Sequence, residues 1–383
     1  PIPDPKIAII GSGIGGLTLG NLLQKNNNFE FTIYEKEETL NLEEGFGIQL
    51  AVNSISVLNQ IGFDSLKKSE IYNPVKLDFY SDKDKICDLD LTQFNSETEK
   101  YTTLKRSFLI KFLKDKLFSN LIRFNKTVEK VEKNQNTIKI SFKDGSSDEV
   151  DYLVVSDGVY SQTKSIIEKK TYRSNYYGSL AIRTTVRSQD ITNFNKKNIS
   201  LLMSSNAHLV LYPVNEKEHN VVVIARNKKR NFFHYKNLNF IKTILNEGII
   251  KNNNSLRPLF NGQLSYWPIY TSKEPKNSKI KNVFYLGDAF YAFSPTMAQG
   301  ASQSIEGAEE LQHILEKNIN DKQNLYFTNR FNRTRVIKKR SNFNYFAFHL
   351  SNKVLVFFRN LILKIIINRK EFIKNYLGKV FRK

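Results

Sequence analysis

A glycine-rich turn near the start of the chain has residue types and a spacing suited to binding phosphate. It runs Gly11-Ser12-Gly13-Ile14-Gly15-Gly16. The first glycine allows a tight bend, the second lets the backbone approach a pyrophosphate, and Gly16 permits close packing of a helix on a strand. Glu35 lies close to the position, about 20 residues further on, where an acidic side chain accepts a hydrogen bond from a ribose. The pattern predicts a dinucleotide site and does not separate NAD from FAD.

The segments around this turn must form a strand, a helix and a second strand to position it. Lys6 to Ile10 is an almost continuously apolar run, typical of a strand buried in a parallel sheet. Leucines recur at helical spacing up to Leu23, and Phe29 to Tyr34 has the pattern of the second strand. Lys281 to Leu286 indicates another buried strand, followed by a helix from about Gln303. Together these segments predict a Rossmann-like sheet.

The middle of the chain has the alternation typical of antiparallel strands. Thr137 to Phe142 and Glu149 to Val155 alternate around Asp144-Gly145, a dipeptide common in hairpin turns. Three further strands indicate a mixed second sheet: Ser179 to Val186, His208 to Val214 and Asn220 to Ala225. From about Gln323 the pattern is helical to the end of the chain.

Two later motifs distinguish between the possible dinucleotides. The first contains Asp157-Gly158 and ends at Lys164; the second is Gly287-Asp288-Ala289, continuing through Pro295 and Gly300 to Glu306. An aspartate at a strand end can accept from a ribityl hydroxyl, and a helix start can present N–H groups to phosphate or to the flavin's carbonyl edge. With the first turn, these motifs resemble the class A flavoprotein monooxygenases, the para-hydroxybenzoate hydroxylase superfamily.

The resemblance implies an α/β fold with two interleaved domains and a C-terminal helical segment. We expect a discontinuous FAD-binding domain at residues 1–72, 100–176 and 273–340, and a mixed β-sheet substrate domain at 73–99 and 177–272. Residues 341–383 would form the C-terminal helices. A chain of 383 residues also exceeds what one hydrophobic core usually serves.

The resemblance also implies which residues bind FAD. The predicted FAD-binding residues are Gly11, Ser12, Gly13, Ile14, Gly15, Gly16, Glu35, Lys36, Arg106, Val128, Asp157, Gly287, Asp288, Pro295, Gly300 and Ala301. Four positions depart from the family pattern. Lys164 replaces an arginine, Phe290-Tyr291 replaces Ala-His, and Gly307 replaces an aspartate. Because the motif around Lys164 is linked to nicotinamide use, the choice between NADH and NADPH stays open.

Smaller matches resemble the salicylate hydroxylase-like subgroup, among them Trp267 to Tyr270 and Pro295 to Ala301. The resemblance implies hydroxylation of a small aromatic or N-heterocyclic substrate by dioxygen through a C4a-hydroperoxyflavin, with NAD(P)H as reductant. His208 and Tyr212, four apart on a predicted strand, face the same side and are the candidate catalytic residues of the substrate pocket. Arg183 either pairs with a substrate carboxylate or forms an external salt bridge.

The C-terminal segment from Asn352 carries nine Lys or Arg against one acid, Glu371. Its apolar residues recur near helical spacing, so it either packs on the flavin domain, which we favour, or lies on an anionic membrane as a peripheral contact. The formal charge of +21 is spread along the chain, so we expect no nucleic-acid partner. No spacing suits a metal, no signal peptide is visible, and a cytoplasmic protein is expected. The oligomeric state is left open.

Two other functions remain possible from the sequence. One is a flavin-dependent epoxidase or hydroxylase that acts on a lipid-like or quinone-precursor substrate at a membrane surface. The other is a flavin-fold binding protein without turnover.

Overall fold

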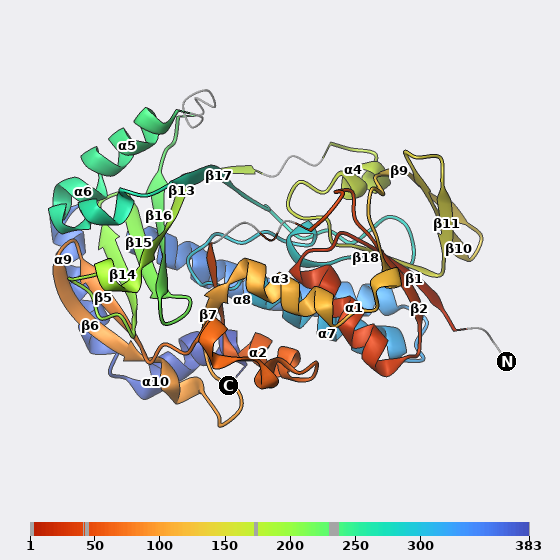
Figure 1. Ribbon diagram of the computed structural model, residues 1–383, viewed down its shortest axis with the longest axis horizontal. Coiled ribbons are helices and arrows are strands. Elements are labelled where there is room, and N and C mark those ends of the chain that lie inside the picture. The colour runs from red at the N-terminus through yellow and green to blue at the C-terminus, as the bar shows by residue number, and fades with distance from the viewer. Residues whose placement is uncertain (1–3, 41, 43–45, 172–174, 230–236, 383) are drawn as a thin grey trace.

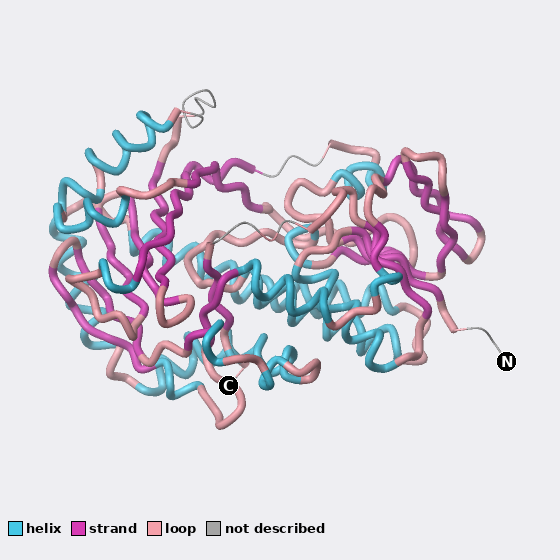
Figure 2. The backbone as a smooth tube through the Cα atoms, in the orientation of Figure 1, coloured by secondary structure: helices cyan, strands magenta, loops and turns pink. Residues whose placement is uncertain are grey.

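The computed structural model describes residues 4–40, 42, 46–171, 175–229 and 237–382. The molecule has two lobes, which Figure 1 shows side by side. One lobe holds the parallel sheet and the N-terminus, and the other holds a larger sheet with the C-terminal helices against it (Figures 1 and 2). The fold is the α/β class with a mixed second sheet that the sequence predicts.

The parallel sheet has the strand order β18-β12-β1-β2-β8. Its strands are β1 (Lys6–Ile10), β2 (Glu30–Tyr34), β8 (Ile122–Arg123), β12 (Tyr152–Val155) and β18 (Val283–Tyr285). Helix α1 (Ile14–Asn26) connects β1 to β2 and packs with α7 (Gly300–Glu316) on the same core. Because β1 is buried on both faces, its sequence is continuously apolar rather than alternating.

The predicted hairpin strand Glu149 to Val155 is wrong as a single element. It divides at Asp151 into β11 (Ser147–Val150), which pairs with β10 (Thr137–Phe142), and β12, which joins the parallel sheet. The Asp151 carboxylate accepts from the Lys6 backbone N–H at 2.7 Å, and its own N–H donates to the Lys6 carbonyl at 2.9 Å. These bonds attach the chain to β1 and redirect it. The outer strand of the hairpin sheet is β9 (Val128–Asn134).

The second sheet has the order β17-β13-β16-β15-β14-β5-β6, with β14 and β5 parallel and the other pairs antiparallel. Its strands are β5 (Lys76–Ser81), β6 (Asp84–Asp90), β13 (Asn175–Arg187), β14 (Ile199–Ser204), β15 (Ala207–Pro213), β16 (Glu218–Arg226) and β17 (Ser265–Thr271). Helices α5 (Leu238–Glu247) and α6 (Ile249–Asn252) cover one face. The opposite face turns toward the C-terminal helices.

A small sheet connects the two lobes. It consists of β3 (Gly47–Leu50), β4 (Ile71–Tyr72) and β7 (Thr102–Lys105), with α2 (Val52–Asn59) and α3 (Arg106–Asp115) following β3 and β7. The Gly47 N–H donates to Asn220 Oδ1 at 2.9 Å, and the Thr103 hydroxyl donates to the Pro213 carbonyl at 2.6 Å. These bonds hold the large sheet against the flavin-binding lobe.

The end of the chain is helical, as predicted. Its helices are α8 (Lys322–Phe348), α9 (Lys353–Ile366), α10 (Lys370–Ile373) and α11 (Lys379–Phe381); the short α4 (Gln162–Glu168) lies earlier. The preferred expectation that this segment packs its apolar residues on the flavin domain is wrong for α9. That helix lies against β6, and most of its large apolar side chains are exposed. No described helix has the length and apolar character needed to cross a bilayer.

Candidate active site

The glycine turn has the geometry that its spacing predicts. Gly11 has φ of +101°, and a Cβ there would lie 2.5 Å from the Ser156 carbonyl oxygen. A Cβ on Gly16 would lie 2.2 Å from the Gly11 carbonyl oxygen. Both positions therefore require glycine to let β1, β12 and α1 meet.

Glycine at positions 13 and 300 has a different explanation. Gly13 precedes α1 with φ of −77°, a value open to any residue, and a Cβ there would meet no protein atom within 4 Å. Gly300, at the start of α7, also faces open space. Neither backbone conformation nor packing explains these glycines, whereas a bound group lying against the two helix N-termini does. These residues fit a dinucleotide.

Glu35 is fastened to the turn. Its Oε2 accepts from the Ser12 N–H at 3.0 Å and from the Ser12 hydroxyl at 2.5 Å, and its Oε1 accepts from the Glu37 N–H at 3.0 Å. The carboxylate is thus held at the end of β2, beside the turn, where it can also accept from a ribose. Lys36 beside it is exposed. Ile14 packs on the core, and Gly15 lies under Leu286, since a Cβ on Gly15 would be 3.3 Å from Leu286 Cγ.

Asp288 follows β18 in a short 3-10 turn, Gly287–Ala289. Its side chain is accessible to solvent, yet enough protein surrounds it that burial raises the pKa of its carboxyl to about 6, partly offset by Arg106. Arg106 begins α3 directly after β7 of the small sheet, so two segments far apart in sequence bring opposite charges close enough to interact.

This raised pKa predicts a pH dependence of cofactor binding to the apoprotein. Ionised Asp288 accepts from a hydroxyl more strongly than the neutral acid, so FAD affinity should rise as pH increases through about 6. Asp288→Asn should flatten this profile and weaken binding about 10-fold or more at pH 8. Fluorescence titration of apoprotein with FAD from pH 5 to 8 measures both effects. Equal profiles for the two proteins would remove Asp288 from the cofactor site.

The Asp157-Gly158 motif is joined to the Gly287-Asp288 motif through a buried lysine. Lys164 Nζ donates to the Ala289 carbonyl at 2.9 Å and lies 4.9 Å from the centroid of the Tyr285 ring. Burial lowers the pKa of Lys164 to about 8. Asp157 accepts from the Ser161 hydroxyl and so helps to cap α4. Lys164 thus points inward, to the protein rather than to a nicotinamide phosphate.

Val128 has its side chain buried in the core of the hairpin sheet. Its side chain therefore faces the protein interior, and a contact of Val128 with the cofactor remains a prediction. Ala301 is half-buried in the first turn of α7, next to Gly300.

A mostly apolar cavity of about 410 Å³ adjoins the loop between the Gly287-Asp288 motif and α7. Pro295, Thr296, Met297 and Ala298 of that loop line it on one side. Side chains from the second sheet line another side: Leu77, Phe79, Leu89, Ile199, Leu201, Met203, His208 and Val210. The size is within the range of small-molecule sites, and a wall of this kind excludes water.

His208 brings a polar group to this cavity. Its Nδ1 lies 2.7 Å from His349 Nε2, and Arg226 Nε donates to His349 Nδ1 at 3.2 Å. Burial lowers the pKa of His208 to about 3 and that of His349 to about 2, so both rings are neutral at physiological pH. Because arginine only donates, His349 carries its proton on Nε2 and donates to His208 Nδ1. His208 is thereby fixed with its remaining proton on Nε2.

Tyr212 is buried on the same strand, in the cluster that also holds Leu201 and Met203, but it is not among the described residues that line the cavity. Its ring closely faces Gly47, whose added Cβ would lie 2.9 Å from Tyr212 Cε2. Arg183 lies between two aromatic rings, 4.7 Å from the centroid of Phe46 and 4.9 Å from that of Trp267. The sequence brings His208 and Tyr212 to one face, as expected, with His208 at the cavity.

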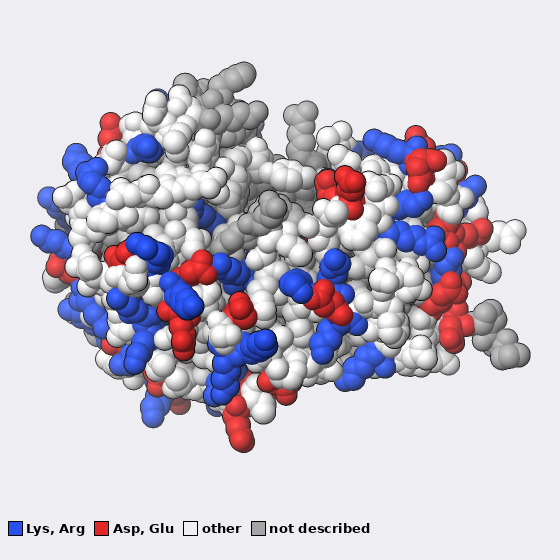
Figure 3. Space-filling model, in the orientation of Figure 1, with Lys and Arg blue, Asp and Glu red and all other residues white. Residues whose placement is uncertain are grey.

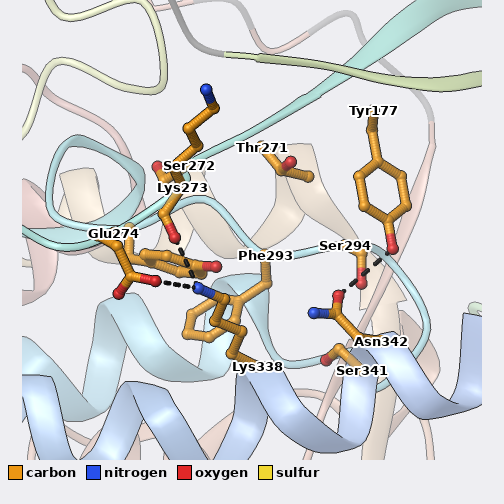
Figure 4. Close-up of a pocket in the computed structure, with 11 residues that line it drawn as sticks. Tyr177, Thr271, Ser272, Lys273, Glu274, Phe293, Ser294, Lys338, Ser341 and Asn342 are labelled. Carbon is orange, nitrogen blue, oxygen red and sulfur yellow. Dashed lines mark hydrogen bonds and ion pairs between the residues drawn. The ribbon is translucent and has the colours of Figure 1, made fainter.

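A second pocket, of about 440 Å³, is lined in part by the same loop, through Phe293 and Ser294 (Figure 4). Lys338 points across it to Glu274, at 2.7 Å, and to the Lys273 carbonyl, at 2.6 Å. The loop therefore contributes to both pockets, one of them apolar and the other polar, with Lys338 paired to Glu274.

The chain matches the model of a known family, described as FAD binding domain, over residues 4–340. The chain belongs to this family, and the fold and motifs are those of the class A flavin monooxygenases, with FAD as cofactor. It is 24% identical over 326 residues to 6-hydroxynicotinate 3-monooxygenase of Bordetella bronchiseptica, covering 82% of this chain and 83% of that one. It is 23% identical to 3-amino-4-hydroxybenzoate 2-monooxygenase of Streptomyces cremeus, covering 82% and 79%.

Two solved structures share the fold. Klebsiella pneumoniae HpxO, complexed with FAD and uric acid, has a TM-score of 0.83 at 17% identity, covering 98% of this chain and 96% of that one. A salicylate hydroxylase substrate complex has a TM-score of 0.78 at 18% identity, covering 99% and 97%.

Sequence reasoning did not find His349 or Arg226. His349 follows the end of α8, 141 residues from His208, and no local pattern relates the two. Among the described residues no group of His, Cys, Asp and Glu is arranged to hold a metal ion.

Proposed function

We propose that this FAD-dependent monooxygenase hydroxylates a small aromatic or N-heterocyclic substrate, with NAD(P)H as reductant and dioxygen as the oxygen source. The observation that carries the proposal is the apolar cavity, which adjoins the loop between the Gly287-Asp288 motif and α7 (the flavin-motif loop). The neutral His208, held in one orientation by His349, lines this cavity. The named relatives, which are monooxygenases of a hydroxynicotinate and an aminohydroxybenzoate, support it. We also propose that the enzyme works in the cytoplasm, where nicotinamide reductant is supplied.

FAD would be held by the residues that the motifs predict. Gly11 to Gly16 and the N-terminus of α1 would face the pyrophosphate, with Glu35 toward the ribose. Asp288 and Arg106 would reach the ribityl chain and its neighbourhood, and the backbone at Pro295, Gly300 and Ala301 would meet the ring. When bound, the flavin supplies electron transfer from NAD(P)H and the activation of dioxygen.

The chain's own residues have three tasks in this reaction. The apolar wall made by Met203, Met297 and Phe79 keeps water from the reacting centre. His208 would donate from Nε2 to an oxygen on the substrate ring and so orient it, with His349 fixing the tautomer. Tyr212, buried beside β3, would contribute a neutral hydroxyl, because burial raises the pKa of that hydroxyl well above its usual range and Arg183 offsets the rise only in part.

The proposal is tested with the FAD-loaded protein and labelled dioxygen. A panel of hydroxybenzoates, aminohydroxybenzoates and hydroxypyridines is screened for NADH and NADPH consumption, and products are analysed by mass spectrometry. We expect one substrate class to give a product with one labelled oxygen atom. If every compound gives only hydrogen peroxide or no consumption, the proposal fails and a binding role without turnover would explain the fold better.

Substitutions of His208 and of Tyr212 should lower turnover by different amounts. His208→Phe should lower kcat/KM about 10-fold or more, because it removes a buried donor, while Tyr212→Phe should lower it about 3- to 10-fold. Flavin content should be unchanged in both variants, since neither side chain belongs to the dinucleotide motifs. Bound FAD is measured by absorbance and turnover by product formation. Wild-type turnover in His208→Phe would assign the histidine pair to packing alone.

A further inference from the structure

Helix α9 presents its apolar side to solvent. Seven side chains form what we call the α9 stripe, each between 45% and 64% exposed: Val354, Leu355, Phe357, Phe358, Leu361, Ile362 and Ile365. At 3.6 residues per turn these positions fall within one half of the helix surface. In a surface helix of a globular protein such a side faces the core.

The orientation of α9 is fixed by a charged residue on its inner side. The Arg359 guanidinium donates to the Ala347 carbonyl at 3.1 Å and to the Ser81 hydroxyl at 2.9 Å. Leu363, on the same side, packs on the cluster behind the second sheet. A rotation that buried the α9 stripe would break the hydrogen bonds of Arg359 to Ala347 and Ser81, so the outward apolar side is a property of the fold.

The apolar cavity borders on this surface. Leu355, Phe358 and Ile362 belong to the α9 stripe and also line the cavity. So do Phe343, Phe346 and Phe372, which are 60%, 57% and 38% exposed. The cavity thus extends from the flavin-motif loop to an exposed apolar surface. Phe357, Leu361 and Ile365 belong to the α9 stripe but not to the described lining.

Basic residues lie along one edge of the α9 stripe and just beyond the end of the helix. Lys353 and Lys364 on α9 are exposed, and so are Arg369, Lys370 and Lys374 just after it. Glu371 is the single acid in this segment. On the face shown in Figure 3, by contrast, Lys and Arg are interspersed with Asp and Glu. An apolar helix side with a basic border matches the interface of an anionic bilayer, into which the side chains insert while the lysines meet headgroups.

We propose that the α9 stripe docks on an anionic lipid bilayer and that the cavity receives an aromatic substrate with an apolar chain from it. The substrate part of this proposal rests on the function proposed above, which supplies the aromatic nature of the substrate. A second copy of this chain fits the stripe less well, because two-fold pairing of the same surface would bring the lysine borders of two strongly basic chains together.

The docking is tested by sedimentation of the FAD-loaded protein with phosphatidylglycerol-containing vesicles and with phosphatidylcholine vesicles. We expect binding to the anionic vesicles, weaker binding to the neutral ones, and at least a tenfold loss in the variant F357E/L361E/I365E. Because none of these three residues lines the cavity, the variant should keep its flavin and its turnover of a water-soluble substrate. The matched control F118E/L238E changes apolar residues that are 69% and 43% exposed elsewhere, and should bind vesicles like the wild type.

Two results would overturn the docking. One is vesicle binding that is absent in the wild type or unchanged in the triple variant. The other is a dimer, seen by analytical ultracentrifugation, that the triple variant dissociates while vesicles are not bound; the α9 stripe would then be a self-association surface. Neither readout needs turnover, so a failure of the proposed function would be recognised separately by the absence of labelled product.

The substrate class is tested by comparing an aromatic compound from the active panel with its octyl-substituted derivative in the presence of anionic vesicles. We expect at least a tenfold higher kcat/KM for the octyl derivative with wild-type protein, and loss of that advantage in the triple variant. An equal or lower kcat/KM for the octyl derivative would overturn the assignment of an apolar-chain substrate.

Discussion

Replacing Gly13 by valine should abolish FAD binding and leave the apoprotein folded. The backbone at Gly13 has a conformation open to valine, and a Cβ there meets no protein atom within 4 Å, so the fold does not oppose the change. The valine methyl groups would instead occupy the space in front of the α1 N-terminus, where the pyrophosphate would lie. We expect a colourless protein whose free energy of unfolding, without cofactor, is within about 1 kcal/mol of the wild-type apoprotein.

Gly16→Ala provides the contrasting control. Its Cβ would lie 2.2 Å from the Gly11 carbonyl oxygen, a clash between two backbone segments that cannot be relieved by a side-chain movement. This variant should lose FAD and stability together, measured by absorbance and by urea unfolding. A yellow Gly13→Val protein with full FAD content would show that the turn does not bind the dinucleotide.

The parts of the fold that were predictable depend on local periodicity. The strand at Lys6–Ile10, the glycine turn and the helix after it are adjacent in sequence, and each has a residue pattern typical of the structure that it forms. The break at Asp151 was missed because its cause is a pair of hydrogen bonds to Lys6, 145 residues away. The small sheet contacts both lobes and does not mark where one domain ends. The predicted domain boundaries therefore remain a prediction.

The candidate site also has parts that the local sequence predicts and parts that depend on contacts between distant residues. His208 was found because a strand places it beside Tyr212 on one face, but the tautomer depends on His349 and Arg226, which only the fold brings together. Periodicity also identified α9 as amphipathic. It could not give the direction of the apolar side, which depends on the bonds that Arg359 makes to Ser81 and Ala347.

Replacing Glu306 by glutamine should be the most destabilising polar substitution that we can identify. Its carboxylate is 1% exposed and lies 2.9 Å from Arg330, 2.7 Å from Arg333 and 2.9 Å from Arg382. Asn53 also donates to it at 2.8 Å. Removing one partner leaves buried charges uncompensated, so the free energy of unfolding should fall by about 3–5 kcal/mol. Asp115→Asn, which removes an exposed pair with Lys111, should cost at most about 0.5 kcal/mol.

The Glu306 carboxylate should also make the stability of the wild-type protein depend on pH, and the variant should lack this contribution. Burial alone would raise the pKa of Glu306, but Arg330, Arg333 and Arg382 outweigh it and lower that pKa to about 2. A folded pKa below the unfolded value of about 4.3 gives stability that is complete at neutral pH and is lost as pH falls from about 4 toward 2. Urea unfolding between pH 7 and 3 should therefore show a shallower acid dependence for Glu306→Gln than for the wild type.

The ion pairs of Glu306 also explain why its substitution should affect the substrate cavity. Arg333 donates to the backbone carbonyls of Lys379 and Val380, which place Phe381 in the cavity lining. With Glu306 neutral, Arg333 loses the partner that fixes its side chain, and α11 loses its attachment to α8. Native-state hydrogen exchange should then show faster exchange at the C-terminus than in the parallel sheet. A variant within about 1 kcal/mol of wild type, with unchanged exchange, would mean that Gln303 and the carbonyls satisfy the arginines without the carboxylate.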